Sequence, residues 1–221
     1  RARVEAESRI IGFLNNGFDF FHPETMLYNK QFPGWWKEAY DTTVTSAGFP
    51  IHEFIVALLM KLFSTTSPWV FRVWTLLWAL LGLCFLYRIA YRLTYDGAKS
   101  LLVSCIAITS PVTAYYLNGF LPGIPALSLS ILGFWFYLSH LESEQKRDFY
   151  LAVAFLTLAM LIRTTFAIAL ITVLCYELLR IFRKESTFID KLPAVLCSLG
   201  AYLVCSFWNR HLTQLHGTIF L

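Results

Sequence analysis

Charged residues are scarce in this sequence, and their scarcity excludes an ordinary soluble domain. Only 14% of the 221 residues are Asp, Glu, Lys or Arg, whereas charged residues make up about 25% of a soluble protein. Hydrophobic residues account for 57% of the chain and aromatic residues for 17%. This composition indicates an integral, polytopic membrane protein of the all-α class.

The sequence also lacks the short motifs that identify common chemistries. Its five cysteines include no close-spaced pair, so neither a disulfide framework nor a zinc site follows from them. His52 and Glu53 begin a metalloprotease-like pattern, but Val56 stands where the second histidine is needed. There is no phosphate loop, dinucleotide-binding glycine pattern or nucleophile elbow. Basic residues flank the apolar segments without forming an aromatic-interleaved patch, so we expect no nucleic-acid partner.

No signal peptide is visible at the start of the chain. The sequence begins with Arg1 and stops within an apolar phrase at Leu221. We therefore expect it to be an internal piece of a longer polypeptide.

Apolar segments alternate with short polar linkers along most of the chain. The apolar segments are residues 69–87, 100–117, 124–141, 149–161, 165–181 and 192–208. Three linkers carry basic residues: Arg88, Arg92 and Lys99; Lys146 and Arg147; and Arg180, Arg183, Lys184 and Lys191. The positive-inside rule places these linkers in the cytoplasm. We therefore predict an external first loop at 1–68, a bundle of about six spans at 69–208, and the start of a further external loop at 209–221.

Arg163 interrupts the apolar run from Tyr150 to Ile181. That run is too long for one crossing, because a hydrocarbon core of about 30 Å needs roughly 20 helical residues. We predict two helices with a hinge at 161–165 that places Arg163 at the outer membrane surface. An ionisable residue at such a position is a functional hypothesis, since burying a charge in lipid is costly. The alternative is an arginine that only ends a helix with its charge turned toward water.

Two short helices are predicted in the first 68 residues. Ile10, Ile11 and Leu14 lie on one face of the first helix, which the Asn16–Gly17 pair ends with a left-handed C-cap. The second helix runs from Ile51 to Phe63. It spans only about 20 Å at 1.5 Å per residue, which is too short to cross a bilayer. We expect both helices to be amphipathic and to lie in the membrane plane.

Phrases in a fixed order along the chain carry a resemblance to a known family. They lie at residues 3–17, 21–23, 48–51, 57–63, 71–72, 110–116, 118–129 and 161–164. In this order they resemble the GT-C superfamily of membrane glycosyltransferases. The nearer branch contains the protein O-mannosyltransferases, of the dolichyl-phosphate-mannose-protein mannosyltransferase type, and the lipid A aminoarabinose transferase.

The resemblance implies an inverting glycosyltransferase. Such an enzyme moves a sugar from a polyprenyl-phosphate-linked donor to an acceptor glycan, lipid or protein on the non-cytoplasmic side. We expect an integral protein of a bacterial inner membrane, in contact with membrane lipids, with its active site facing the periplasm or exterior. Relatives differ in their need for a divalent metal, so the cofactor stays unknown and no metal ligands are assigned.

An inverting transfer needs a general base for the acceptor hydroxyl. In the family this base is an acid at the start of the first external helix, a role that the resemblance assigns to Glu5, with Glu7 as the alternative. Residues two apart on a helix point in different directions, and Glu7 continues the apolar stripe whereas Glu5 does not. We therefore prefer Glu5. The alternative is that both acids only stabilise the helix N-terminus through its dipole.

The resemblance also implies cations that hold the donor phosphate, for which arginine is better suited than lysine. These cations are Arg72, Arg163, Arg210 and His211. Side chains bordering the same face are expected to contact the sugar or acceptor. These side chains are His22, Tyr115, Tyr116 and Asn118. Anchoring of these residues at the water–lipid interface is the alternative.

Two glycines depart from the family pattern. Gly48 and Gly123 stand where relatives usually have acids, and the acid at the second position supports the catalytic site. These departures leave open a catalytically inactive homologue or scaffold. A transporter for lipid-linked sugars would use similar arginines but would need no base.

Overall fold

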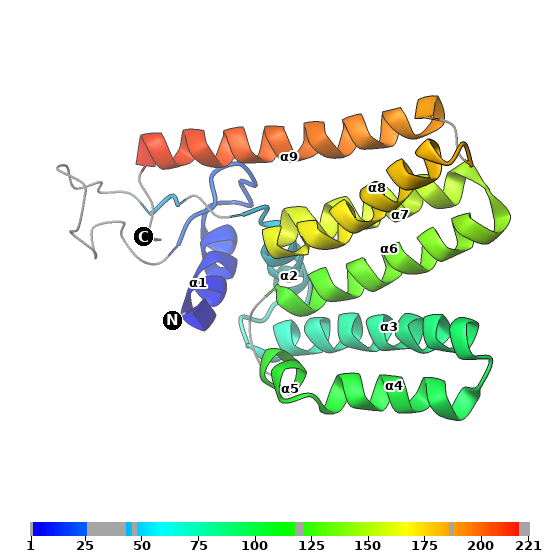
Figure 1. Ribbon diagram of the computed structural model, residues 1–221. Coiled ribbons are helices and arrows are strands. Elements are labelled where there is room, and N and C mark those ends of the chain that lie inside the picture. Colours follow the sequence, from blue (N-terminus) through cyan, green and yellow to red (C-terminus); the bar gives the residue numbers. More distant parts are fainter. Residues whose placement is uncertain (1, 26–42, 46–47, 118–121, 186–187, 217–221) are drawn as a thin grey trace. The chain divides into compact units, whose positions relative to one another are not determined.

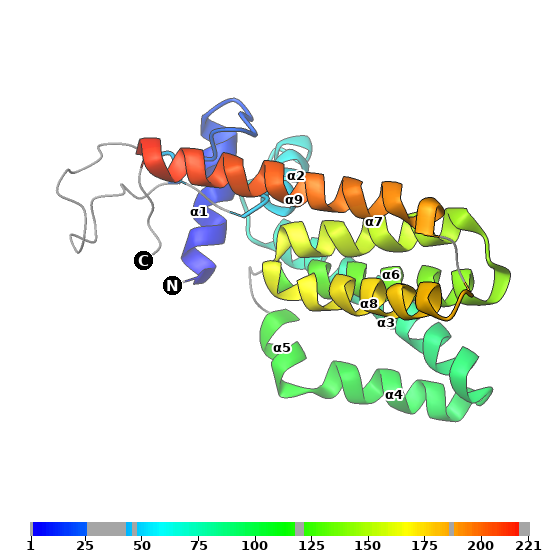
Figure 2. The ribbon, with the colours of Figure 1, turned by 45° about the horizontal axis from the view of Figure 1, so that its top comes forward.

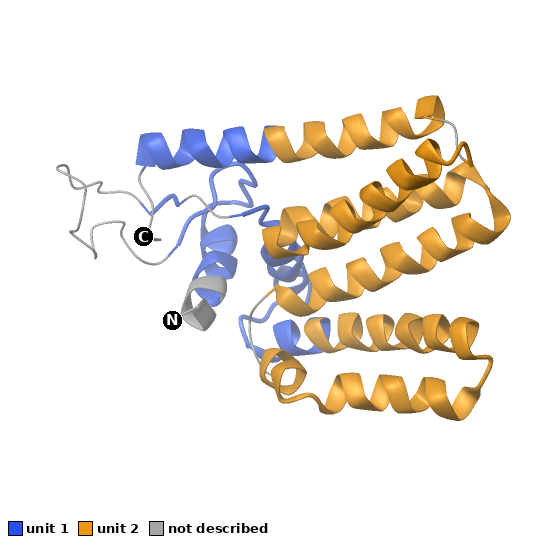
Figure 3. Ribbon diagram, viewed as in Figure 1, with its two compact units in different colours: residues 1–74, 119–121, 204–221 blue, residues 75–118, 122–203 orange. Residues whose placement is uncertain are grey.

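The computed structural model describes residues 2–25, 43–45, 48–117, 122–185 and 188–216. In the first helix, side chains are described from Glu7 onward. The chain divides into two compact units (Figure 3). Unit 1 comprises residues 1–74, 119–121 and 204–221, and unit 2 comprises residues 75–118 and 122–203. The external loop predicted at 1–68 lies within unit 1.

Unit 1 contains the two helices α1 (Ala2–Asn15) and α2 (Ile51–Leu62). Both agree closely with the predicted helices. Gly17 has φ +73°, the left-handed conformation that glycine adopts without a steric penalty, so the predicted end of α1 is confirmed. An apolar core lies between α1, α2 and the first turn of α3 (Trp69–Thr94). It contains Ile10, Phe13, Val56, Ala57, Met60, Val70 and Phe71.

A short piece of extended chain packs against α1. Glu24 and Val44 form an antiparallel bridge, with Thr25 N donating to Thr43 O at 2.9 Å. The Glu24 carbonyl also lies so close to Gly12 that a Cβ there would be 2.1 Å from its oxygen. Only a glycine allows this approach of backbone to helix.

Unit 2 is a bundle of helices. It begins with residues 75–94 of α3. The helices α4 (Gly97–Thr109), α5 (Pro111–Leu117), α6 (Gly123–Ser143) and α7 (Lys146–Ile162) follow, and then the short 3₁₀ helix η2 (Thr164–Phe166) and α8 (Ala167–Phe182). The last helix, α9 (Phe188–His216), belongs to unit 2 up to residue 203 and to unit 1 beyond it. The antiparallel pair α6–α7 lies side by side in Figures 1 and 2. Close packing of this pair depends on Gly133, because a Cβ there would lie 2.6 Å from Cγ of Leu156. The main core of unit 2 is formed by residues of α6, α7, α8 and the first part of α9.

Four of the described helices are long and apolar enough to cross a membrane: α3, α6, Thr164–Phe182 and α9. The pair α4–α5 would make a fifth if its two parts, bent by 63°, form one broken span. The all-α polytopic class is thus confirmed, with four or five candidate spans in the described chain where about six were predicted. Ser110 precedes Pro111 and leaves the helical conformation, which breaks the segment at 100–117. The segment at 149–161 lies in α7, which has 17 residues and extends only about 25 Å.

Candidate functional site

Arg163 lies between α7 and α8, as predicted. The chain leaves the helix at this residue, with φ −148° and ψ 111°. The Arg163 amide still donates to Ala159 O, and the Arg163 carbonyl accepts from Phe166 N, both at 3.0 Å. The residue is therefore fixed at a hinge whose backbone groups are paired on both sides.

The guanidinium of Arg163 rests on two neighbours within unit 2. Its Cζ lies 5.5 Å from the ring centroid of Tyr116, a cation–π distance. A Cβ added to Gly123 would lie 2.8 Å from Arg163 Nη1 and 3.3 Å from Tyr116 Cδ1. The absence of a side chain at position 123 therefore lets the guanidinium lie against the backbone at the start of α6.

No carboxylate pairs with Arg163 among the residues that the structure describes. The side chain is half-buried, so its charge is partly removed from water without being neutralised. Such a group attracts an anion more strongly than an exposed arginine does.

Tyr115 and Tyr116 belong to α5, whose C-terminal end precedes Gly123 in the chain. Their rings meet edge to face at 5.6 Å. Tyr115 is exposed and Tyr116 is half-buried. Unit 2 thus brings Tyr116, Gly123 and Arg163 together, while Asn118 lies outside the described residues.

The other predicted site residues belong to unit 1. Glu7 is half-buried on α1, and Arg72 is exposed on the first turn of α3. The side chain of Glu5 lies outside the described part of the chain. Arg210 and His211 are exposed. Both lie near the end of α9, since this helix continues past Trp208 to His216. They therefore lie on a helix, where a loop had been expected.

His22 lies in the loop after α1. Its Nδ1 is 2.9 Å from Asp19 Oδ2, and both side chains are about half exposed. Trp208 Nε1 donates to the carbonyl of Phe21 at 3.2 Å, so this loop is attached to the α9 residues of unit 1. The His22 loop and the segment that carries Arg210 therefore meet within unit 1.

A buried ion pair joins α1 to α2 and was missed in the sequence. Arg9 Nη1 lies 3.3 Å from Glu53 Oε1, with side chains 14% and 3% exposed. The helix that carries Glu53 had been predicted to lie in the membrane plane as an amphipathic helix, on which a charged side chain faces water. Glu53 instead shares the buried stripe of Val56, Ala57 and Met60. The three- and four-residue spacing of that stripe could have revealed its burial.

His52 lies beside this ion pair and is also buried. Trp74 Nε1 lies 3.2 Å from Nδ1 of His52, and Nε2 of His52 has no hydrogen-bond partner among the described residues. Burial lowers the pKa of His52 below its usual value, and the nearby Arg9 lowers it further, although Glu53 opposes the shift. His52 is therefore neutral at neutral pH, which suits a ring that accepts a hydrogen bond from an indole.

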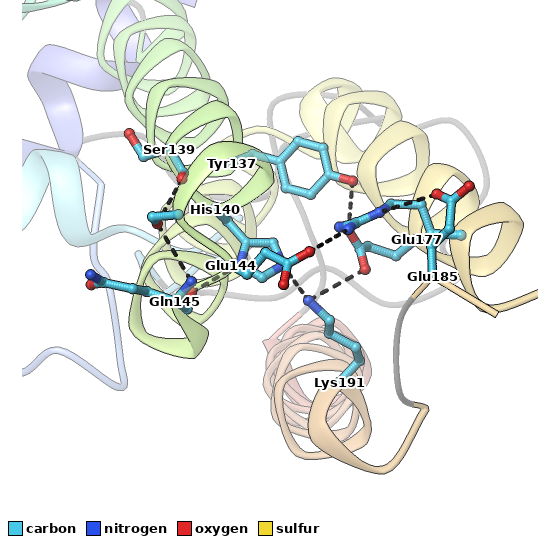
Figure 4. Close-up of polar contacts among 10 residues, drawn as sticks. Tyr137, Ser139, His140, Glu144, Gln145, Glu177, Glu185 and Lys191 are labelled. Carbon is cyan, nitrogen blue, oxygen red and sulfur yellow. Dashed lines mark hydrogen bonds and ion pairs between the residues drawn. The ribbon is translucent and has the colours of Figure 1, made fainter. Parts of the chain in front are cut away.

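A second group of buried polar residues lies in unit 2, where α6 and α8 end and α9 begins. Tyr137, His140, Glu177 and Lys191 are each less than 9% exposed, and Figure 4 shows them converging. Lys191 had been assigned to a solvated basic linker. The structure instead places its ammonium against Glu177, on a different helix.

Metal ligands are not gathered anywhere in the described residues: no group of three or more His, Cys, Asp or Glu side chains there could hold an ion.

Comparison with known proteins gives one match. The sequence pattern of the dolichyl-phosphate-mannose-protein mannosyltransferase family matches residues 46–208. The matched segment contains α2 to α8, and with them Gly123 and Arg163. Searches of curated proteins and of solved structures found no match.

Proposed function

Because the chain belongs to the dolichyl-phosphate-mannose-protein mannosyltransferase family, we propose that it catalyses an inverting glycosyl transfer on the non-cytoplasmic face of a membrane. The donor is a sugar linked to a polyprenyl phosphate, and the acceptor is a glycan, lipid or protein. We further propose that the membrane is a bacterial inner membrane and that the site faces the periplasm or exterior.

The observation that supports this proposal best is the guanidinium of Arg163, which no carboxylate of the described residues neutralises. A sugar–phosphate bond breaks when negative charge on the leaving phosphate is stabilised, and a positioned cation supplies that stabilisation. Arginine presents paired N–H donors that match two phosphate oxygens. The contact with Tyr116 at 5.5 Å orients the guanidinium before the ligand binds, which reduces the cost of ordering it.

We assign the remaining roles as the sequence suggested. Glu5, or alternatively Glu7, takes the proton of the acceptor hydroxyl. Arg72, Arg210 and His211 supply further positive charge toward the phosphate. His22, Tyr115, Tyr116 and Asn118 contact the sugar or acceptor. The confirmed helical conformation at 2–15 supports the first assignment, because a helix can present one acid in a fixed direction.

The test is transfer of labelled sugar from polyprenyl-phosphate donors in membranes that express the full-length gene. Arg163→Ala is expected to lower turnover by about 100-fold, a typical cost of removing one group that stabilises transition-state charge. Arg163→Lys should recover only part of the rate, because lysine lacks the bidentate geometry. Arg183→Ala serves as the matched control, since Arg183 is an exposed arginine at the opposite end of α8.

Two results would contradict the proposal. Equal activity of Arg163→Ala and the natural protein would remove Arg163 from the site. Donor binding without any transfer by the natural protein would favour the inactive homologue or the lipid-linked sugar transporter.

A further inference from the structure

His140 is a buried residue whose two ring nitrogens both have partners. Its Nδ1 lies 2.8 Å from the carbonyl oxygen of Gln145, and its Nε2 lies 2.5 Å from Nζ of Lys191 (Figure 4). A carbonyl oxygen only accepts hydrogen bonds, so Nδ1 must carry a proton. An ammonium group only donates, so Nε2 must be the bare, accepting nitrogen. The partners therefore assign His140 to the neutral Nδ1–H tautomer.

Lys191 is held as an ammonium by its other contacts. Its Nζ lies 3.3 Å from Glu177 Oε2 and 3.9 Å from the ring centroid of Phe149. A carboxylate and an aromatic face both attract a cation. With these two neighbours Lys191 acts as the donor toward His140.

The charged groups around His140 leave little capacity to neutralise a further proton. On α8, Glu177 accepts hydrogen bonds from Tyr137 OH at 2.8 Å and from Arg180 Nη1 at 3.2 Å, in addition to its pairing with Lys191.

The remaining charged groups are already paired or lie farther out. Glu144 and Glu185 are exposed and lie 3.9 Å from Arg180. Asp190 on α9 pairs with Lys146 on α7 at 2.8 Å.

We propose that the contact between His140 and Lys191 is a proton-sensitive lock that joins the end of α6 to the start of α9. The lock is closed while His140 is neutral. A second proton on His140 removes the accepting lone pair and places two cations side by side, so the lock opens on acidification.

A cavity adjoins the lock and gives its opening a structural consequence. The cavity has a volume of about 200 Å³ and is lined by Glu177 and Lys191 together with apolar residues such as Phe149, Leu174 and Leu192. Displacement of the Lys191 ammonium from His140 would bring charge and water into this space. The first turns of α9 would then lose a contact that holds them to α6.

The tautomer can be tested directly on the full-length protein in lipid nanodiscs with ¹⁵N-labelled histidine. The chain has five histidines, so the resonance lost in His140→Gln identifies His140. We expect the Nδ1–H tautomer at neutral pH. A doubly protonated ring or the Nε2–H tautomer under these conditions would overturn the proposal.

The opening can be tested by amide hydrogen exchange at Ala194, Val195 and Leu196, which follow Pro193 near the start of α9. Exchange is corrected for its intrinsic dependence on pH. In the natural protein we expect about tenfold faster exchange at about pH 5 than at about pH 8, the range in which histidine titrates.

His140→Gln is the matched control, because its amide can donate to Gln145 and accept from Lys191 but takes up no proton. Its exchange should not change with pH. Equal acceleration in both proteins, or acceleration in neither, would contradict the lock. If His140→Gln does not fold, substitution of the other four histidines in turn assigns the His140 resonance by elimination. The tautomer of the natural protein then decides the proposal.

Discussion

The guanidinium of Arg9 and the carboxylate of Glu53 lie 3.3 Å apart between α1 and α2, where both side chains are largely buried. This pair is surrounded by the apolar core that contains Phe13, Val56 and Met60. Two opposite charges in such a place stabilise one relative arrangement of the helices, because removing either partner leaves the other charged and buried. Since α1 carries the proposed base, the pair also bears on how that base is presented.

Glu53→Gln should therefore destabilise unit 1 strongly. Breaking one side of a buried ion pair costs about 3–5 kcal/mol, so thermal unfolding in detergent should shift to clearly lower temperature. The double variant Arg9→Met with Glu53→Gln should recover much of this loss, because it removes both charges from the interface. Additive effects of the two substitutions would show that the residues do not interact.

Gly123→Asp should weaken binding of the donor lipid. The new side chain would begin in close contact with Arg163, since a Cβ at this position is 2.8 Å from Arg163 Nη1. The flexible arginine can shift and pair with the acid, which neutralises the charge proposed to hold phosphate. A loss of about 1.4 kcal/mol corresponds to roughly tenfold weaker binding, measurable by titration with a fluorescent polyprenyl phosphate.

Gly123→Asn separates charge from size in this experiment, because asparagine has nearly the same shape but no negative charge. It should bind the donor lipid better than Gly123→Asp. Higher transfer activity in Gly123→Asp than in both the natural protein and Gly123→Asn would instead show that the site needs an acid there.

Gly12→Ala should disrupt the packing of the extended segment on α1. Its Cβ would lie 2.1 Å from the backbone oxygen of Glu24, and a backbone atom cannot move aside as a side chain does. Overpacking of this kind costs about 1–3 kcal/mol. Gly200→Ala is the matched control, because no atom lies within 4 Å of a Cβ there. Unfolding temperatures should fall for Gly12→Ala alone.

Acidification should destabilise unit 1 through His52. Burial lowers the pKa of His52 in the folded protein, so the unfolded chain binds a proton at higher pH than the folded chain does. The resulting stability is fully present above about pH 6.5, the usual histidine value, and is lost as the pH falls toward the lowered pKa. Unfolding by denaturant between about pH 7 and pH 5 would measure this loss. His52→Gln should show a flatter dependence, whereas an unchanged slope would exclude His52 as its source.

Local features of the sequence predicted much of the fold. The Asn16–Gly17 pair identified the end of α1, and the apolar run interrupted by Arg163 identified the hinge between α7 and α8. These predictions succeeded because helix caps and breaks depend on a few neighbouring residues. The break at Ser110 was missed although Pro111 signals it, since the apolar segment around it was treated as one span.

The sequence predicted only part of the candidate site. Arg163 was identified as a residue at a hinge, but its contact with Tyr116 and Gly123 depends on how α5, α6 and α7 pack. Lys191 was predicted to lie in a solvated basic linker, because the sequence shows only the charges that are close to it along the chain. Its partners His140 and Glu177 belong to other helices, and no local pattern relates them.

By itself, the sequence determined the membrane class, the positions of most helices and the family resemblance, because composition, hydrophobic runs and caps are local properties. Only the tertiary structure decided which charges are paired and buried. The Arg9–Glu53 and Lys191–Glu177 contacts each join different helices, and charges can be buried there only because packing brings an opposite charge within about 4 Å.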